Sequence, residues 1–249
     1  MNSYLNNKIL EVSNVSKSFG TKTVLKNVSI NLAEGEIVGL LGVSGSGKST
    51  LFNIISGTLK PDSGEVFLKG EDITGEVGKI SYMLQKDLLL PHMTIVENVS
   101  LPLVLKGINK TEAVKSAQKY FHIFGIDGTE RKYPYSLSGG MRQRAALLRT
   151  YMNKNEVILL DEPFSALDMI TKGKMHNWFL EIIRSINLSA LFVTHDVDEA
   201  IYLSNRVYVL SPYGEITDEI VIDEVYPREE SFKLSERFLM YKKQIISIL

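Results

Sequence analysis

The sequence predicts a mixed α/β protein built as one unit, and two observations carry this prediction. Three continuous apolar runs have the composition of strands buried on both faces of a parallel sheet. These runs lie at residues 37–41, 157–160 and 190–193. Between the second and third runs, apolar residues from Met175 to Ile186 recur at helical spacing, which predicts a core-facing helix. Strand, helix and strand form a βαβ unit, whose crossover is expected to be right-handed.

The other elements surround this unit in chain order. Short alternating apolar stretches predict half-exposed strands of an antiparallel layer, at residues 9–12, 28–32 and 65–68. Residues 88–135 are expected to form an inserted helical lobe, in which Thr111 caps a helix that runs to Phe124. After Pro212 we expect a short tail with a helix that contains Phe232, Leu234, Phe238 and Leu239.

Composition excludes several classes of protein. Of the 249 residues, 44% are hydrophobic and 23% are charged, which is enough apolar material for a folded core. The 28 Lys and Arg residues balance 29 Asp and Glu residues, so no basic excess indicates a nucleic-acid partner. The chain lacks Cys, and His92, His122 and His176 show no metal-ligand spacing. Residues 1–10 are too polar for a signal peptide, and no apolar run approaches the ~20 residues that span a bilayer. We therefore expect any membrane role to act through a partner.

Residues 42–49 follow the pattern G-x-x-x-x-G-K-[ST], between a buried strand and an apolar helix. Glycines let the backbone wrap closely around phosphate groups, and the start of the helix adds partial positive charge. Lys48 is expected to meet the β- and γ-phosphates of a nucleotide, and the Ser49 hydroxyl to bind Mg²⁺. The predicted nucleotide-binding residues of this segment are Gly42, Ser44, Gly45, Ser46, Gly47, Lys48, Ser49 and Thr50.

Two carboxylates follow the apolar run at 157–160, at the strand end where open α/β sheets bind ligands. Asp161 is expected to contact Mg²⁺ directly or through water, and Glu162 to orient and polarise an attacking water. Two acids at a strand end are by themselves usually a solvated turn. The phosphate-binding loop in the same sheet makes a hydrolytic role the stronger interpretation.

Residues 137–144 (LSGGMRQR) contain a second candidate phosphate site. Ser138, Gly139 and Gly140 open a helix whose N-terminal N–H groups can hold a phosphate. One ATP does not need two phosphate cradles in one subunit, so the simplest geometry has the second cradle serve the ATP of a partner copy. The arginines of the following helix are expected to be solvated surface residues: Arg142, Arg144 and Arg149.

The LSGGMRQR segment closely resembles the signature of ATP-binding cassette (ABC) ATPases, and the resemblance covers nearly the whole chain. It implies a P-loop NTPase core of the RecA-like type, with the N-terminal antiparallel β layer and an inserted helical subdomain. Residues 1–249 would form one nucleotide-binding domain. Its expected parts are a core at 1–87 and 153–230, a helical subdomain at 88–152 and a C-terminal tail at 231–249.

The resemblance also assigns roles to single residues. Phe19 matches the aromatic residue that stacks on adenine, where Tyr is commoner. Gln85 matches the glutamine that joins core and helical lobe and approaches Mg²⁺ and water. Residues 165–168 match the loop where two subunits meet, and His195 the histidine that contacts the γ-phosphate. The expected catalytic residues are Glu162, His195 and Gln85, and the expected Mg²⁺ contacts are Ser49, Gln85 and Asp161.

Residues 163–168, residues 194–200 and Met141 resemble the importer branch that takes up nitrate, sulfonates, taurine or related small compounds. Members of that branch often have Trp where this chain has His92. The resemblance implies an ATP-hydrolysing homodimer, peripheral at the cytoplasmic face of the cell membrane. Integral membrane permease subunits are its expected partners, with an extracytoplasmic solute-binding protein as an indirect one. Docking is expected near residues 85–105, where Leu88 to Leu90 fit either a docking surface or the core of the lobe.

Two other functions stay open at this level. A soluble ABC-type ATPase in a non-transport complex would share the same site, but ribosome-acting members usually carry two cassettes. The segment between Lys48 and Ser138 is also too short for the coiled coils of repair ATPases. A nucleotide-binding regulatory subunit that does not hydrolyse would dispense with Glu162 and His195, and this chain has both. The sequence favours transport and leaves the solute unidentified.

Overall fold

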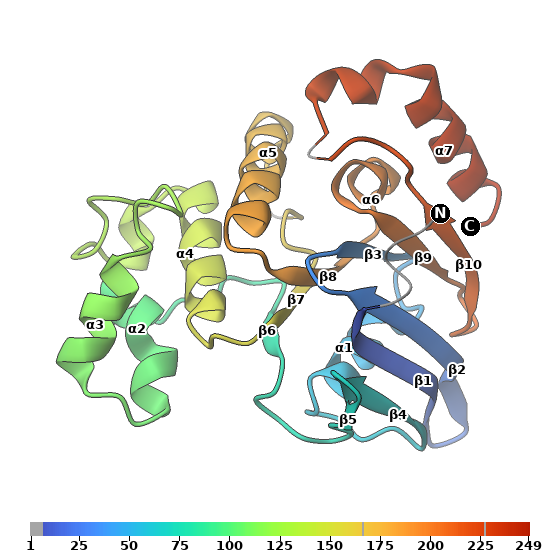
Figure 1. The fold of residues 1–249 in the computed structure, drawn as a ribbon, viewed down its shortest axis with the longest axis horizontal. Coiled ribbons are helices and arrows are strands. Elements are labelled where there is room, and N and C mark those ends of the chain that lie inside the picture. The colour runs from blue at the N-terminus through green and yellow to red at the C-terminus, as the bar shows by residue number, and fades with distance from the viewer. Residues whose placement is uncertain (1–6, 166, 227) are drawn as a thin grey trace.

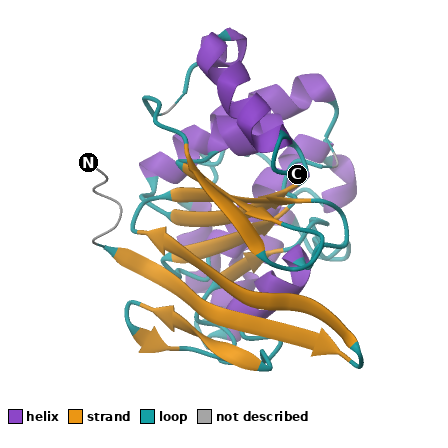
Figure 2. Cartoon of the chain, turned by 90° about the vertical axis from the view of Figure 1, so that its right-hand side faces the viewer, coloured by secondary structure: helices purple, strands orange, loops and turns teal. Residues whose placement is uncertain are grey.

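The computed structural model describes residues 7–165, 167–226 and 228–249 (Figure 1). The expectations for residues 1–6 of the N-terminal segment and for Ala166 lie outside the described residues. Two sheets form the body of the molecule, as Figure 2 shows from the side. The antiparallel sheet has the strand order β2-β1-β4-β5 and confirms the predicted N-terminal layer. Its strands are β1 (Lys8–Phe19), β2 (Lys22–Ala33), β4 (Ser63–Leu68) and β5 (Glu71–Asp72).

The second sheet has six strands in the order β10-β9-β3-β8-β7-β6. All of its neighbouring strands pair in parallel except β10, which runs antiparallel to β9. The three apolar runs are confirmed as its central strands, which are buried along almost their whole length. The strands are β3 (Ile37–Gly42), β6 (Ser81–Met83), β7 (Val157–Asp161), β8 (Ser189–Thr194), β9 (Arg206–Leu210) and β10 (Ile216–Val221).

Helix α1 (Lys48–Ile55) lies between the two sheets, and other helices cover the outer face of the parallel sheet. Helix α1 buries Leu51 and Phe52 in a core shared with both sheets. On the other face lie α5 (Met169–Ser185), which is the helix predicted by the apolar spacing, and α6 (Val197–Leu203). The phosphate-binding loop and the carboxyl ends of β7 and β8 therefore come to the same edge of the parallel sheet.

The inserted helical lobe projects away from the two sheets (Figure 1). It contains α2 (Ile95–Leu105), α3 (Lys110–Gln118) and α4 (Gly139–Tyr151). Thr94 and Glu97 form a capping box at the start of α2. The predicted cap of the next helix is wrong: the Asn109 side chain accepts from the Thr111 N–H (2.9 Å), so α3 begins two residues earlier. It also ends before Phe124, which packs into the core from a turn.

The C-terminal tail folds back over α6. A short 3₁₀ helix at Glu230–Leu234 precedes α7 (Glu236–Ile246), and Ser235 caps α7 between them. The single helix expected across Phe232 and Leu239 is therefore two elements, because the Ser235 hydroxyl accepts from the Phe238 N–H and starts a new helix. Within the residues that the structure describes, no helix is both long and apolar enough to cross a membrane.

Candidate nucleotide-binding site

The phosphate-binding loop joins the end of β3 to the start of α1, and two of its glycines are required by their surroundings. A Cβ on Gly42 would lie 2.6 Å from the Leu210 carbonyl oxygen. A Cβ on Gly47 would lie 2.9 Å from the Val24 carbonyl oxygen, and this residue has a φ of 104°. Neither position has room for a side chain. Glycine at both positions therefore allows the backbone to adopt the tight turn that a phosphate-binding loop needs.

Lys48 points back into this loop. Its Nζ donates to the carbonyl oxygens of Gly42 and Val43, both at 2.8 Å. Burial lowers the pKa of Lys48, and the carboxylates of Glu162 and Asp161 oppose that shift. Ser46 is only 1% exposed, and its Oγ has no hydrogen-bond partner among the described residues. The loop thus holds a buried cation and a buried free hydroxyl, a combination suited to phosphate oxygens.

Asp161 ends strand β7 opposite the start of α1. Its Oδ2 accepts from Ser49 Oγ (3.3 Å) and from the Tyr82 hydroxyl (3.4 Å). Burial raises the pKa of Asp161, partly offset by the hydrogen bond from Ser49. Tyr82 was not among the predicted residues, and burial together with the Asp161 carboxylate raises its own pKa.

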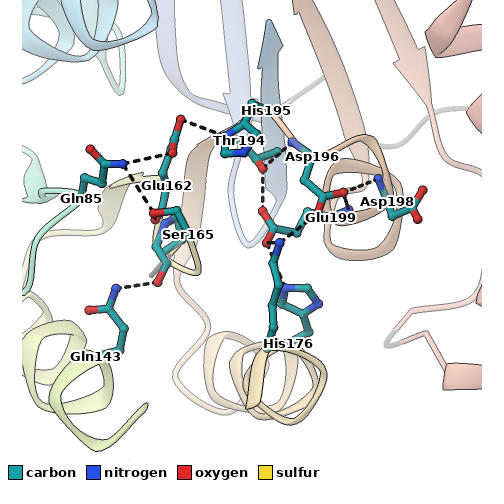
Figure 3. Close-up of polar contacts among 12 residues, drawn as sticks. Gln85, Gln143, Glu162, Ser165, His176, Thr194, His195, Asp196, Asp198 and Glu199 are labelled. Atoms are coloured by element: carbon teal, nitrogen blue, oxygen red, sulfur yellow. Dashed lines mark hydrogen bonds and ion pairs between the residues drawn. The ribbon is translucent and has the colours of Figure 1, made fainter. Parts of the chain in front are cut away.

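Glu162 takes a different direction from Asp161 because its backbone is left-handed, with a φ of 45°. One carboxylate oxygen lies 3.1 Å from His195 Nδ1, and the other accepts from Gln85 Nε2 at 3.2 Å (Figure 3). The same Gln85 amide reaches Ser165 Oγ at 3.5 Å. The structure thus brings the three predicted catalytic residues into contact from three separate segments.

A cleft of about 540 Å³ runs along these groups. Its lining comprises Val24, Ser44, Gly45, Gly47, Lys48, Ser49, Thr50, Gln85, Asp161, Glu162 and His195. Phe19, at the end of β1, is 52% exposed and lies outside this lining, with Lys17 Nζ 5.7 Å from its ring. The ring is therefore free to stack on a planar group.

The segment from Ser138 to Gly140 does not join this cleft. Gly139 lines a neighbouring cleft of about 690 Å³, which shares Gln85, Glu162 and His195 with the first cleft. Ser138 and Gly140 line neither cleft. Ser138 caps α4 by accepting from the Met141 N–H at 3.3 Å. Within one chain, residues 138–140 thus lie outside the lining of the phosphate-binding cleft, and the second phosphate cradle stays a prediction.

The arginines of α4 contradict the prediction of solvated surface. Arg149 donates to the carbonyl oxygens of Asp87 (2.6 Å) and Leu88 (2.7 Å). Arg142 Nε donates to the Asp87 carboxylate at 3.1 Å. Arg144 lies 4.7 Å from the ring of Trp178. The helical pattern predicted exposed positions for these arginines because they lie off the apolar face. Their partners, a loop and an aromatic ring, are distant in sequence, so the pattern could not reveal them. They tie α4 to the segment that follows Gln85 and to α5.

The parallel sheet, the phosphate-binding loop and the acidic strand end define a P-loop NTPase. The comparison with protein families narrows this class: residues 25–165 match the model of the ABC transporter family, and the chain belongs to that family.

Relatives of known assignment cover nearly all of the chain. It is 41% identical to the formylaminopyrimidine import ATP-binding protein ThiZ of Halalkalibacterium halodurans, over 97% of this chain and 96% of that protein. It is 38% identical to the nitrate import ATP-binding protein NrtD of Synechocystis sp., with 96% and 94% covered. It is 40% identical to the aliphatic sulfonates import ATP-binding protein SsuB of Bacillus cereus, with 93% and 90% covered.

Among solved structures, a dimeric ABC transporter cassette in a post-hydrolysis state with ADP and Pi superposes with a TM-score of 0.74. It is 32% identical in sequence, and the match covers 87% of this chain and all of that one. The chain is thus an ATP-hydrolysing subunit of an ABC importer, as the sequence predicted, and the comparisons give no support to a soluble non-transport ATPase.

Proposed function

We propose that two copies of this chain bind two ATP·Mg²⁺ between them and use Glu162 as the base that activates the attacking water. The observation that carries the proposal is the contact of Glu162 with Gln85 and His195 beside the phosphate-binding cleft. A carboxylate held between an amide and an imidazole can take a proton from water, and His195 is placed to support the γ-phosphate.

The phosphate groups and Mg²⁺ would occupy the cleft around Lys48. The free Ser46 hydroxyl and the Lys48 ammonium fit phosphate oxygens. Mg²⁺ prefers hard oxygen ligands. The cleft offers three of them: Ser49 Oγ and Asp161 Oδ2, which lie 3.3 Å apart, and the side-chain oxygen of Gln85. When bound, Mg²⁺ supplies charge neutralisation at the phosphates. Among the described residues, no group of three or more His, Cys, Asp or Glu side chains could hold a metal ion by itself.

A second copy would complete each site. Residues 138–140 do not line the phosphate-binding cleft of their own chain, which supports their use on the ATP of a partner copy. Phe19 would stack on the adenine from the exposed end of β1. The helical subdomain at 88–152 would then move relative to the core at 1–87 and 153–230 as the two copies close.

A groove next to Gln85 is the proposed docking site for a membrane permease. Its volume is about 470 Å³, and it lies between the segment after β6 and the helices α2 and α4. Leu90 lines it, Leu88 is exposed beside it and Leu89 is buried, so the three leucines divide between docking surface and core. Arg149 also lines the groove and fixes the backbone at Asp87 and Leu88. A displacement of the groove by a docked partner would thus be transmitted to Gln85, which lies only two or three residues before Asp87 and Leu88.

The relatives support a small polar or anionic solute, since their assignments are to formylaminopyrimidine, nitrate and aliphatic sulfonates. The chain would act from the cytoplasmic face of the membrane. An extracytoplasmic solute-binding protein would deliver the solute to the permease, so this chain would not touch it.

A single-cysteine cross-link tests the docking and the transport role. Because the chain has no Cys, Leu105→Cys places one thiol in the groove, at a side chain that is 78% exposed, for a photo-reactive label. In membranes of the source organism we expect a cross-link to a multi-span membrane protein. Val77→Cys, exposed and outside the groove, is the matched control. Cross-links to ribosomes or to soluble proteins alone, or equal yields from both positions, would reject the proposal.

A further inference from the structure

The His195 side chain is weakly held by its own packing. The side chain is 60% exposed, and its Nδ1 lies 3.1 Å from a Glu162 carboxylate oxygen. His195 directly follows strand β8. An exposed imidazole keeps such a contact only if the backbone that carries it is fixed. The residues on either side of His195 therefore decide where its ring lies.

Thr194 bonds directly to the buried carboxylate of Glu199 on α6, and Asp196 is linked to that carboxylate through the Thr194 hydroxyl. Thr194 Oγ1 donates to Glu199 Oε2 at 2.5 Å and accepts from the Asp196 N–H at 3.0 Å (Figure 3). The Asp196 carboxylate in turn accepts from the N–H of Glu199 at 3.3 Å. The turn at His195 is thus closed by hydrogen bonds from both sides.

Helix α5 holds the same carboxylate from the opposite side. Lys172 Nζ lies 2.7 Å from Glu199 Oε1 and 2.8 Å from Asp196 Oδ2. His176 Nε2 lies 3.3 Å from Glu199 Oε1. Because α5 begins at Met169, directly after the 165–168 loop, the cluster connects that loop to the turn at His195.

Burying the charged and polar groups of this cluster costs desolvation free energy. The cost indicates that the directional hydrogen bonds of these groups are needed at this place. Glu199 is 4% exposed and His176 is 5% exposed. Burial alone would raise the pKa of Glu199, but hydrogen bonds from His176, Lys172 and Thr194 bring it below its ordinary value. Apolar residues would fill the same space without this cost, but they would not fix the Thr194 hydroxyl.

We propose that Glu199 is a positioning residue for hydrolysis, which holds His195 at Glu162 by fixing Thr194 and Asp196 and anchoring both to α5. The proposal rests on the role given to His195 in the proposed function. Glu199 itself does not line the nucleotide cleft, so its loss should act on turnover and not on nucleotide binding.

A kinetic comparison of Glu199→Ala, Glu199→Gln and His195→Ala tests this. We expect Glu199→Ala to lower kcat about 10- to 100-fold, the order of effect of a small misplacement, with the KM for ATP within twofold of the parent. Glu199→Gln keeps an oxygen for the Thr194 hydroxyl and should retain more activity. In a chain that already carries His195→Ala, adding Glu199→Ala should lower kcat less than twofold.

The control is Glu36→Gln, which weakens another buried ion pair, with Arg206 at 2.7 Å. It should lower the melting temperature and leave kcat of the folded protein intact. Full kcat in Glu199→Ala beside an impaired His195→Ala would overturn this inference alone. An equal loss on both backgrounds would also overturn it. Full kcat in His195→Ala would overturn the role of His195 and this inference together. If Glu199→Ala does not fold, Thr194→Val, which removes the hydroxyl held by Glu199, carries the same comparison.

Discussion

Replacing Glu162 by Gln should separate ATP binding from ATP hydrolysis. The amide has the same shape as the carboxylate, so its oxygen can still accept from Gln85 Nε2, and the contact with His195 keeps a polar partner. The backbone at this residue is unchanged. What the variant loses is the ability to take a proton from water.

The size of the effect follows from that single loss. General-base catalysis contributes about 10²- to 10⁴-fold, so kcat should fall by that factor. This corresponds to about 2.7–5.4 kcal/mol of transition-state stabilisation. The negative charge of Glu162 borders the cleft that is to hold the phosphates, and its removal lessens repulsion. The Kd for ATP should therefore be unchanged or lower.

Phosphate release measures the turnover, and light scattering with ATP present measures whether two copies stay together. Because ATP is bound but not hydrolysed, we expect the variant to accumulate as an ATP-bound dimer. Glu156→Gln is the matched control, since Glu156 lies just before the other end of β7 and pairs with Lys69. A Glu162→Gln protein that keeps kcat within threefold of the parent would refute the role of Glu162 as base.

Three further predictions test the rest of the site. Lys48→Ala should raise the Kd for ATP about 10- to 150-fold, the loss of one charge-assisted hydrogen bond, as measured with a fluorescent ATP analogue; unchanged binding would contradict the phosphate cradle. Gly42→Ala should cost about 1–3 kcal/mol of stability in thermal unfolding, because its Cβ would lie 2.6 Å from a backbone oxygen, and a melting temperature equal to the parent's would count against this packing. Asp161→Asn should stabilise the nucleotide-free protein, because a raised carboxyl pKa costs stability once the pH exceeds the ordinary value of about 3.9, and the gain should grow with pH and then level off above the folded-state pKa. Melting temperatures across that pH range would expose a flat or opposite trend.

Local sequence patterns are sufficient for some parts of this site and not for others. The loop at 42–49 is predictable because its glycines, Lys48 and Ser49 lie within one short segment, and the structure places it between β3 and α1 as expected. Tyr82 could not be found in this way, because its contact with Asp161 joins two neighbouring strands that are far apart in sequence. The arginines of α4 were misjudged for the same reason, since their partners are distant in sequence: loop carbonyl oxygens for Arg149, a loop carboxylate for Arg142 and the Trp178 ring for Arg144.

The predicted start of a helix was wrong where two nearby residues could each serve as its N-cap. Thr111 and Asn109 are both good N-cap residues, and only the fold shows that the Asn109 side chain reaches the backbone of residue 111. In the tail, the apolar spacing of Phe232 and Leu239 suggested one helix, but Ser235 interrupts it with a cap of its own. The spacing of apolar residues indicates which side chains share a helix face. It says little about where one helix ends and the next begins.

The left-handed backbone at Glu162 explains how one strand end can serve two chemical roles. In a regular strand, adjacent side chains point to opposite faces, and Asp161 follows this rule towards Ser49. At Glu162 the chain turns sharply, held by the Glu162 N–H to the Val193 oxygen (3.1 Å) and the Ser165 N–H to the Glu162 oxygen (3.2 Å). This conformation costs about 1–3 kcal/mol and persists only because the surroundings fix it. It aims the Glu162 carboxylate along the sheet edge towards Gln85 and His195. The strain thus separates the residue suited to the metal from the residue suited to the water, although the two are neighbours in sequence.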